Sequence, residues 1–244
     1  MKYFFFLLFP ILFFGQNKPL KINIVSITSL DSIPEERKFT IRYSVENTTN
    51  KEVAFFLEPE KLFPAHSNAM ATGIFYKLFQ EKEELIINGI FSNKKFRKID
   101  GFPDFSKLST DAEREKAVRN YIEEYMKKEN DSIEKLTKKG VTEIEAHKIR
   151  ASSSLLKAVC TLKPKETKTY STEWYWDKQR YFKRAEFEYF LNEKATFYLQ
   201  FYLFLMKEQY QDKLTKADYE TLMKIPNFIK GVYQSEKVEI NLKE

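Results

Sequence analysis

The residues best suited to binding chemistry form the tripeptide Trp174-Tyr175-Trp176. Alternate side chains of a strand point to the same face, which places the two indoles about 7 Å apart on one side. Flat aromatic rings at this spacing can stack on sugar rings, but aromatic residues also bury a large area in protein cores. Trp174 and Trp176 are therefore the candidate ligand-binding residues, and packing in the core is the interpretation that a sandwich fold favours.

Catalysis on glycans would need a pair of carboxylates. A glycoside hydrolase holds two of them roughly 5–10 Å apart in a cleft, and Glu58, Asp100 and Asp104 are the candidates for such a pair. His66 lies in a predicted loop, and the fold could bring it near Asp100 or Asp104. No sequence motif joins these residues, so none of them is assigned a catalytic role.

Histidine and cysteine are too sparse to predict a metal site or a cofactor. The chain contains His66, His147 and Cys160, and no pair of them has the spacing of zinc ligands. His147 follows Glu143 by four residues, which indicates a solvated pair on a helix. Cys160 alternates with apolar neighbours, so we expect a buried thiol that packs as a small apolar residue.

The N-terminal segment has the layout of a secretory signal. Lys2 supplies a positive charge, residues 3–14 are almost wholly apolar, and Gly15 is small enough for a cleavage site. A membrane-spanning helix needs roughly 20 apolar residues, which this run does not reach. We therefore expect a signal peptide over residues 1–15, export to the periplasm or beyond, and no membrane span once the signal is removed. Because the lone cysteine is Cys160, we expect neither an internal disulfide nor a lipid anchor.

The composition is that of a folded protein with a mixed surface. Apolar residues make up 43% of the chain, enough for a sizeable core. The net charge is +6, with 35 acidic residues dispersed among 41 basic ones, and this pattern argues against a nucleic-acid partner. We expect one domain over residues 16–244, with a helical insertion at about residues 107–152.

Period-two alternation predicts most of the remaining chain as strands, and it is strictest over residues 39–46. Asn47-Thr48-Thr49-Asn50 then reads as a turn, although it also fits a glycosylation sequon. Residues 195–205 are apolar on both faces, which predicts a central strand, and residues 179–191 fit either a helix or a strand. The other predicted strands cover residues 20–28, 53–57, 74–79, 85–91, 156–162, 169–176 and 238–242.

Three helices are predicted from their capping residues. Thr110 and Glu113 form a capping box at the start of the insertion, and Asn130 marks a possible break before the helix ends at Gly140. Thr142 opens the second helix of the insertion. A third helix follows Thr215, covers residues 216–224 and stops before a proline.

Three segments resemble the immunoglobulin-like sandwiches of many uncharacterised exported bacterial proteins, and distantly the proteinase-inhibitor-type sandwich. They are residues 39–47, 162–170 and 231–240, and their similarity lies in how strands run into turns. Lys165 stands where such proteins usually have a turn glycine, and the helical insertion is a further departure. The resemblance implies a mainly β fold (α+β overall), an immunoglobulin-like antiparallel β-sandwich, and carries over no functional residue.

Together these features predict a non-enzymatic binding or interaction module of the cell envelope, whose partner is a protein or a polysaccharide. Two alternatives stay open. The first is a glycan-acting hydrolase or carbohydrate-binding protein, and the second is a protease-inhibitor-like sandwich.

Overall fold

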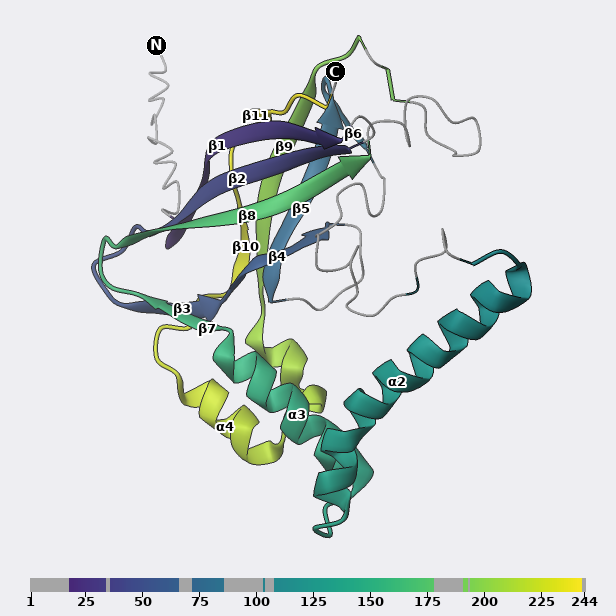
Figure 1. The fold of residues 1–244 in the computed structure, drawn as a ribbon. Helices are drawn as coiled ribbons and strands as arrows, with labels where there is room; N and C mark the ends of the chain where they lie inside the picture. Colours follow the sequence, from purple (N-terminus) through teal and green to yellow (C-terminus); the bar gives the residue numbers. More distant parts are fainter. Residues whose placement is uncertain are drawn as a thin grey trace, which may run out of the picture.

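The computed structural model describes residues 18–33, 36–65, 72–85, 103, 108–177, 191–192 and 194–242. Strand accounts for 43% of the structure and helix for 31%, so the fold is mainly β, as predicted. Figure 1 shows the strands gathered in one body, with the helices extending from one end of it. The predicted signal peptide lies outside the described residues.

The first sheet contains three antiparallel strands in the order β1-β2-β8. They are β1 (Leu20–Ile33), β2 (Glu36–Asn47) and β8 (Thr167–Asp177). Alternation along β2 confirms the prediction, because Phe39, Ile41, Tyr43 and Val45 are all buried on one face. β1 runs further than predicted, to Ile33, and is one of the two edge strands of this sheet.

The second sheet has the order β10-β9-β5-β4, and two short strands pair beside it. β9 (Phe197–Leu205) is buried on both faces, which confirms the predicted central strand. β10 is the edge strand on one side of this sheet. β4 pairs with β5 in parallel, so the expectation of a wholly antiparallel fold is wrong here. Alternation shows which face of a strand is buried, but it carries no information about the direction of the neighbour. The other strands of this sheet are β4 (Glu58–Pro64), β5 (Gly73–Gln80), β6 (Glu83–Leu85), β10 (Gly231–Gln234) and β11 (Val238–Glu239).

A close approach between β4 and β5 requires glycine at position 73. A Cβ atom built on Gly73 would lie 2.4 Å from the backbone oxygen of Lys61, which cannot swing aside as a side chain could. We predict that Gly73→Ala lowers the free energy of unfolding by roughly 3 kcal/mol. Chemical denaturation measures this loss against Gly140→Ala, where φ is +86° but no atom lies within 4 Å. The free energy of unfolding of the Gly140→Ala control should fall by only about 1 kcal/mol. Equal losses of stability in the two variants would contradict the steric explanation.

A two-stranded sheet joins β3 (Val53–Phe56) to β7 (Val159–Leu162), beside the helices. β7 begins later than the sequence predicted, because the preceding helix extends to Lys157. The predicted strand at residues 85–91 coincides with the described chain only at Leu85, the end of β6. The ambiguous segment at residues 179–191 falls outside the described residues apart from Leu191.

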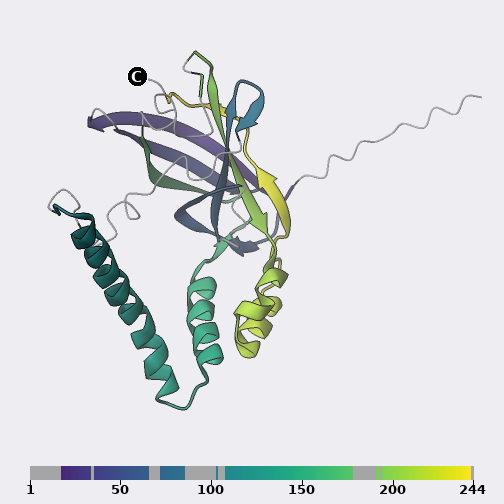
Figure 2. The ribbon, with the colours of Figure 1, turned by 90° about the vertical axis from the view of Figure 1, so that its right-hand side faces the viewer.

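The helices are α2 (Asp111–Thr137), α3 (Glu143–Lys157), the 3-10 helix η2 (Lys207–Lys213) and α4 (Lys216–Lys224). The Thr110–Glu113 capping box is present, and hydrogen bonds from the Thr110 and Ser109 backbones lower the pKa of the Glu113 carboxyl. The predicted break at Asn130 is wrong: α2 is continuous, because one asparagine costs a long helix only a few tenths of a kcal/mol, roughly. The residues of α4 match the prediction, and η2 was not predicted. Figure 2 shows α2 and α3 as a V that opens toward the sheets.

Two apolar cores hold these elements together. The larger contains residues of both main sheets, including Tyr43 of β2 and Phe201 of β9, whose rings meet edge to face. The smaller lies where β3 meets the helices, and there Phe56 packs edge to face against Tyr210 and Phe228. The sheets and the helical end are thus joined through β3, one face of which contributes to each core.

Candidate functional site

Trp174 and Trp176 lie inside the larger core. Their exposed fractions are 2% and 0%, and they sit opposite Phe39 and Arg37 of β2 in the strand register. With so little ring surface exposed, neither indole offers a face on which a sugar could stack. Their position agrees with the core-packing interpretation of the tripeptide.

The other residues that the sequence singled out are dispersed. Glu58 forms an ion pair with Lys61, with a 2.6 Å N–O distance, and accepts a hydrogen bond from the hydroxyl of Thr72. Asp100, Asp104 and His66 lie outside the described residues, so a carboxylate pair stays a prediction. In the part of the chain that the structure describes, no three potential metal ligands of the His, Cys, Asp or Glu type gather.

His147 and Cys160 have surroundings close to those expected. His147 and Glu143 are both exposed, with 3.9 Å between the imidazole and the carboxylate, as in a solvated helix pair. Cys160 is half-buried rather than fully buried, and its Sγ lies 3.5 Å from the backbone oxygen of Leu57. Burial raises the pKa of this thiol, which keeps it in the unreactive protonated form.

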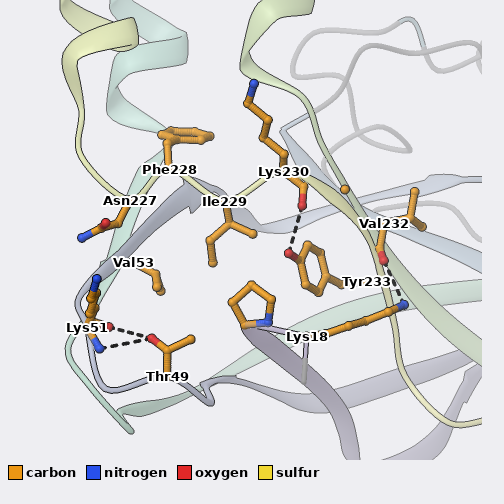
Figure 3. Close-up of a pocket in the computed structure, with 12 residues that line it drawn as sticks. Lys18, Thr49, Lys51, Val53, Asn227, Phe228, Ile229, Lys230, Val232 and Tyr233 are labelled. Atoms are coloured by element: carbon orange, nitrogen blue, oxygen red, sulfur yellow. Dashed lines mark hydrogen bonds between the residues drawn. The ribbon is translucent and has the colours of Figure 1, made fainter. Parts of the chain in front are cut away.

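A pocket of about 560 Å³ opens at the end of the sheets where β3 and β10 approach each other. Three chain segments far apart in the sequence surround it, as Figure 3 shows. We call it the end pocket. It is lined by Lys18, Pro19, Thr49, Lys51, Val53, Asn227, Phe228, Ile229, Lys230, Gly231, Val232 and Tyr233.

The side chain of Asn47 builds the first wall. Its Nδ2 donates to the backbone oxygens of Lys51, Leu162 and Lys163 at 2.7, 3.1 and 2.8 Å. Its Oδ1 accepts from the backbone N–H and the hydroxyl of Thr49 at 2.9 and 2.8 Å. The amide is fully buried, so this asparagine shapes a turn, as the sequence favoured, and positions Thr49 and Lys51 at the pocket.

The second wall is the segment that leads into β10. The backbone N–H of Ile229 donates to the Ala54 oxygen at 2.8 Å, and the N–H of Ala54 donates to the Asn227 oxygen at 3.2 Å. Asn227 and Gly231 adopt positive φ angles of 52° and 111°, which bend the chain around the pocket. The hydroxyl of Tyr233 closes this wall by donating to the Lys230 oxygen at 2.9 Å.

The third wall is the start of the described chain. The carbonyl of Pro19 accepts from the backbone N–H of Thr48 at 3.0 Å, and the carbonyl of Lys18 accepts from the Thr48 hydroxyl at 2.7 Å. These bonds tie the segment before β1 to the same turn that Asn47 organises. The pocket therefore depends on hydrogen bonds between segments that are distant in the sequence.

The end pocket combines an apolar floor with a positive rim. Val53, Ile229 and Tyr233 are each at most 5% exposed and form the floor. The ammonium of Lys18 donates to the Val232 oxygen at 3.2 Å, and the ammonium of Lys230 is paired with Glu208 outside the pocket. Within the described residues, no ion pair or hydrogen bond of the Lys51 ammonium is found, so this cation is available to a ligand.

The sequence did not predict this pocket. The turn at residues 47–50 was recognised, but nothing local indicates that residues 18–19 and 227–233 lie against it. Its lysines are ordinary members of a mixed surface when the sequence is read alone.

None of the helices in the described part of the chain combines the length and apolar character that crossing a membrane requires. Comparison of the chain with protein-family models, curated proteins and solved structures finds no match in any of the three.

Proposed function

We propose that this protein is an exported, non-enzymatic binding module of the cell envelope, built on an immunoglobulin-like sandwich, and that the end pocket is its ligand site. The observation that carries the proposal is the pocket's combination of a buried apolar floor with a lysine rim. The signal-like N-terminus supports export, and the core packed between two sheets supports the sandwich.

The size and chemistry of the pocket suit binding. Ligand pockets measure roughly 300–1,000 Å³ and combine apolar walls with a few placed polar groups, and the end pocket has about 560 Å³. Its rim lysines, Lys18 and Lys51, attract an anion, while the exposed side chain of Val232 offers apolar surface to a ligand. The ligand is therefore expected to join a negative charge to an apolar body.

Octanoate is a suitable probe, because it has one carboxylate and one alkyl chain. Titration of the ¹⁵N-labelled protein should shift the backbone amide signals of Lys18, Leu20 and residues 48–53 and 227–234, and the shifts should saturate. Lys51→Met should weaken binding by roughly fivefold, because an exposed ion pair contributes up to about 1 kcal/mol.

The matched control is Lys216→Met, an exposed lysine at the start of α4 and outside the pocket. It should bind octanoate as the unmodified protein does. Scattered shifts without saturation, or equal affinities of the two lysine variants, would remove the support for the end pocket as a ligand site.

A further inference from the structure

The outward edge of β10 faces the end pocket. The backbone N–H of Ser235 donates to the Phe201 oxygen at 2.9 Å, and the register with β9 is constant back to Gly231. Backbone groups of alternate residues in a strand point to opposite sides. Tyr233 and Gly231 therefore direct their backbone groups at β9, while those of Val232 and Gln234 point away from it.

The contact of Lys18 confirms this direction. Its ammonium reaches the Val232 oxygen from the pocket side, at 3.2 Å, as Figure 3 shows. In the described sheet β10 pairs with β9 alone, so Val232 presents a strand edge within the lining of the pocket. An edge of this kind is a template for an added strand.

The charge on the pocket determines which strand would fit. Lys18 and Lys51 lie in the lining, and the lining described above contains no carboxylate. The Lys18 ammonium donates a hydrogen bond to the Val232 oxygen. A backbone N–H of an added strand would replace it as the donor. A carboxylate on that strand would then receive the released ammonium.

We propose that the end pocket binds an extended acidic peptide segment, which adds to β10 as a strand. Its backbone N–H donates to the Val232 oxygen, its carbonyl accepts from the Val232 N–H, and its carboxylates meet Lys18 and Lys51. Its apolar side chains pack beside the exposed side chain of Val232. This inference rests on the proposed function, since it names the ligand class for the same pocket.

The test uses an acetylated and amidated peptide of alternating valine and glutamate, labelled for fluorescence anisotropy. A second peptide carries glutamine in place of every glutamate. We expect the glutamate peptide to bind about tenfold more tightly, the equivalent of one or two charge contacts. Lys51→Met should reduce this preference, whereas Lys216→Met should leave it unchanged.

Two N-methylated glutamate peptides test the strand addition. One is methylated on all valine nitrogens and the other on all glutamate nitrogens, and in an extended strand these sets face opposite sides. One of the two should lose binding while the other retains it. This design changes only the ligand, so it does not depend on whether a protein variant folds.

The outcomes separate the two proposals. Equal binding of the glutamate and glutamine peptides overturns the acidic class, and retention of binding by both methylated peptides overturns strand addition. If octanoate saturates the pocket but no peptide binds, the peptide inference fails and the proposed function stands. If neither probe binds, both fail.

Discussion

Asn47→Asp is expected to lower the free energy of unfolding by roughly 3 kcal/mol or more. The change keeps the shape of the side chain but replaces the Nδ2 donor with an oxygen. That oxygen would face the three backbone oxygens of Lys51, Leu162 and Lys163 in a fully buried site. Each carbonyl loses its donor, and at neutral pH a carboxylate is buried against them.

Urea unfolding, followed by circular dichroism, measures this effect. The matched control is Asn50→Asp, the same change three residues later at an exposed position of the same turn. It should alter the stability by no more than about 0.5 kcal/mol. Because Asn47 also holds Thr49 and Lys51 in place, Asn47→Asp should lose octanoate binding under conditions where it is still folded. Similar stabilities of the two variants would show that the Asn47 network is not what holds this turn.

Trp176→Ala is expected to lower the free energy of unfolding by roughly 3–5 kcal/mol, the usual range for removing a large aromatic side chain from a core. Trp176 is fully buried between the sheets, so the change leaves a cavity that the surrounding strands cannot close. A sugar-stacking residue on an open surface would instead lose binding with little loss of stability. Thermal and chemical unfolding therefore distinguish the two interpretations of the Trp174-Tyr175-Trp176 tripeptide.

Two further variants, an exposed control and a conservative change in the core, calibrate this measurement. Ile144→Ala removes an apolar side chain that is 74% exposed on α3, and should change the stability by no more than about 0.5 kcal/mol. The Nε1 of Trp174 is buried, and among the described residues it has no hydrogen-bond partner. Trp174→Phe removes this unpaired donor, and the gain offsets part of the lost packing. The variant should therefore lower the free energy of unfolding by less than about 1.5 kcal/mol. A Trp176→Ala protein as stable as Ile144→Ala would contradict the core assignment.

Local chemistry explains most of what could be predicted here. The alternation of β2 and β9 reports burial directly, because each side chain of a strand faces one side or the other. Thr110, Thr142 and Thr215 cap α2, α3 and α4 as predicted, since an N-cap needs only a side-chain oxygen near the first free N–H groups. Lys165, noted as an unusual replacement for a turn glycine, indeed adopts a positive φ of 61°.

The errors arise where distant parts of the chain decide the outcome. β4 runs parallel to β5, and no pattern within either strand contains that information. The helix α3 extends into a segment that was predicted as strand, because Leu155 and Leu156 pack against the smaller core rather than between the sheets. η2 is short and lacks an apolar period, so it had no signal of its own.

The end pocket likewise separates features that depend on neighbouring residues from features that depend on distant contacts. Residue types alone were sufficient to predict a mainly β chain, its capped helices and a turn at Asn47, because each of these depends on neighbours within a few residues. Only the folded chain places Lys18, Lys51 and Val232 around one pocket, since its walls are joined by hydrogen bonds between segments 30 to 214 residues apart in the sequence. Contacts at that separation depend on the whole topology, and for that reason the mainly β class could be read from the sequence while the candidate site could not.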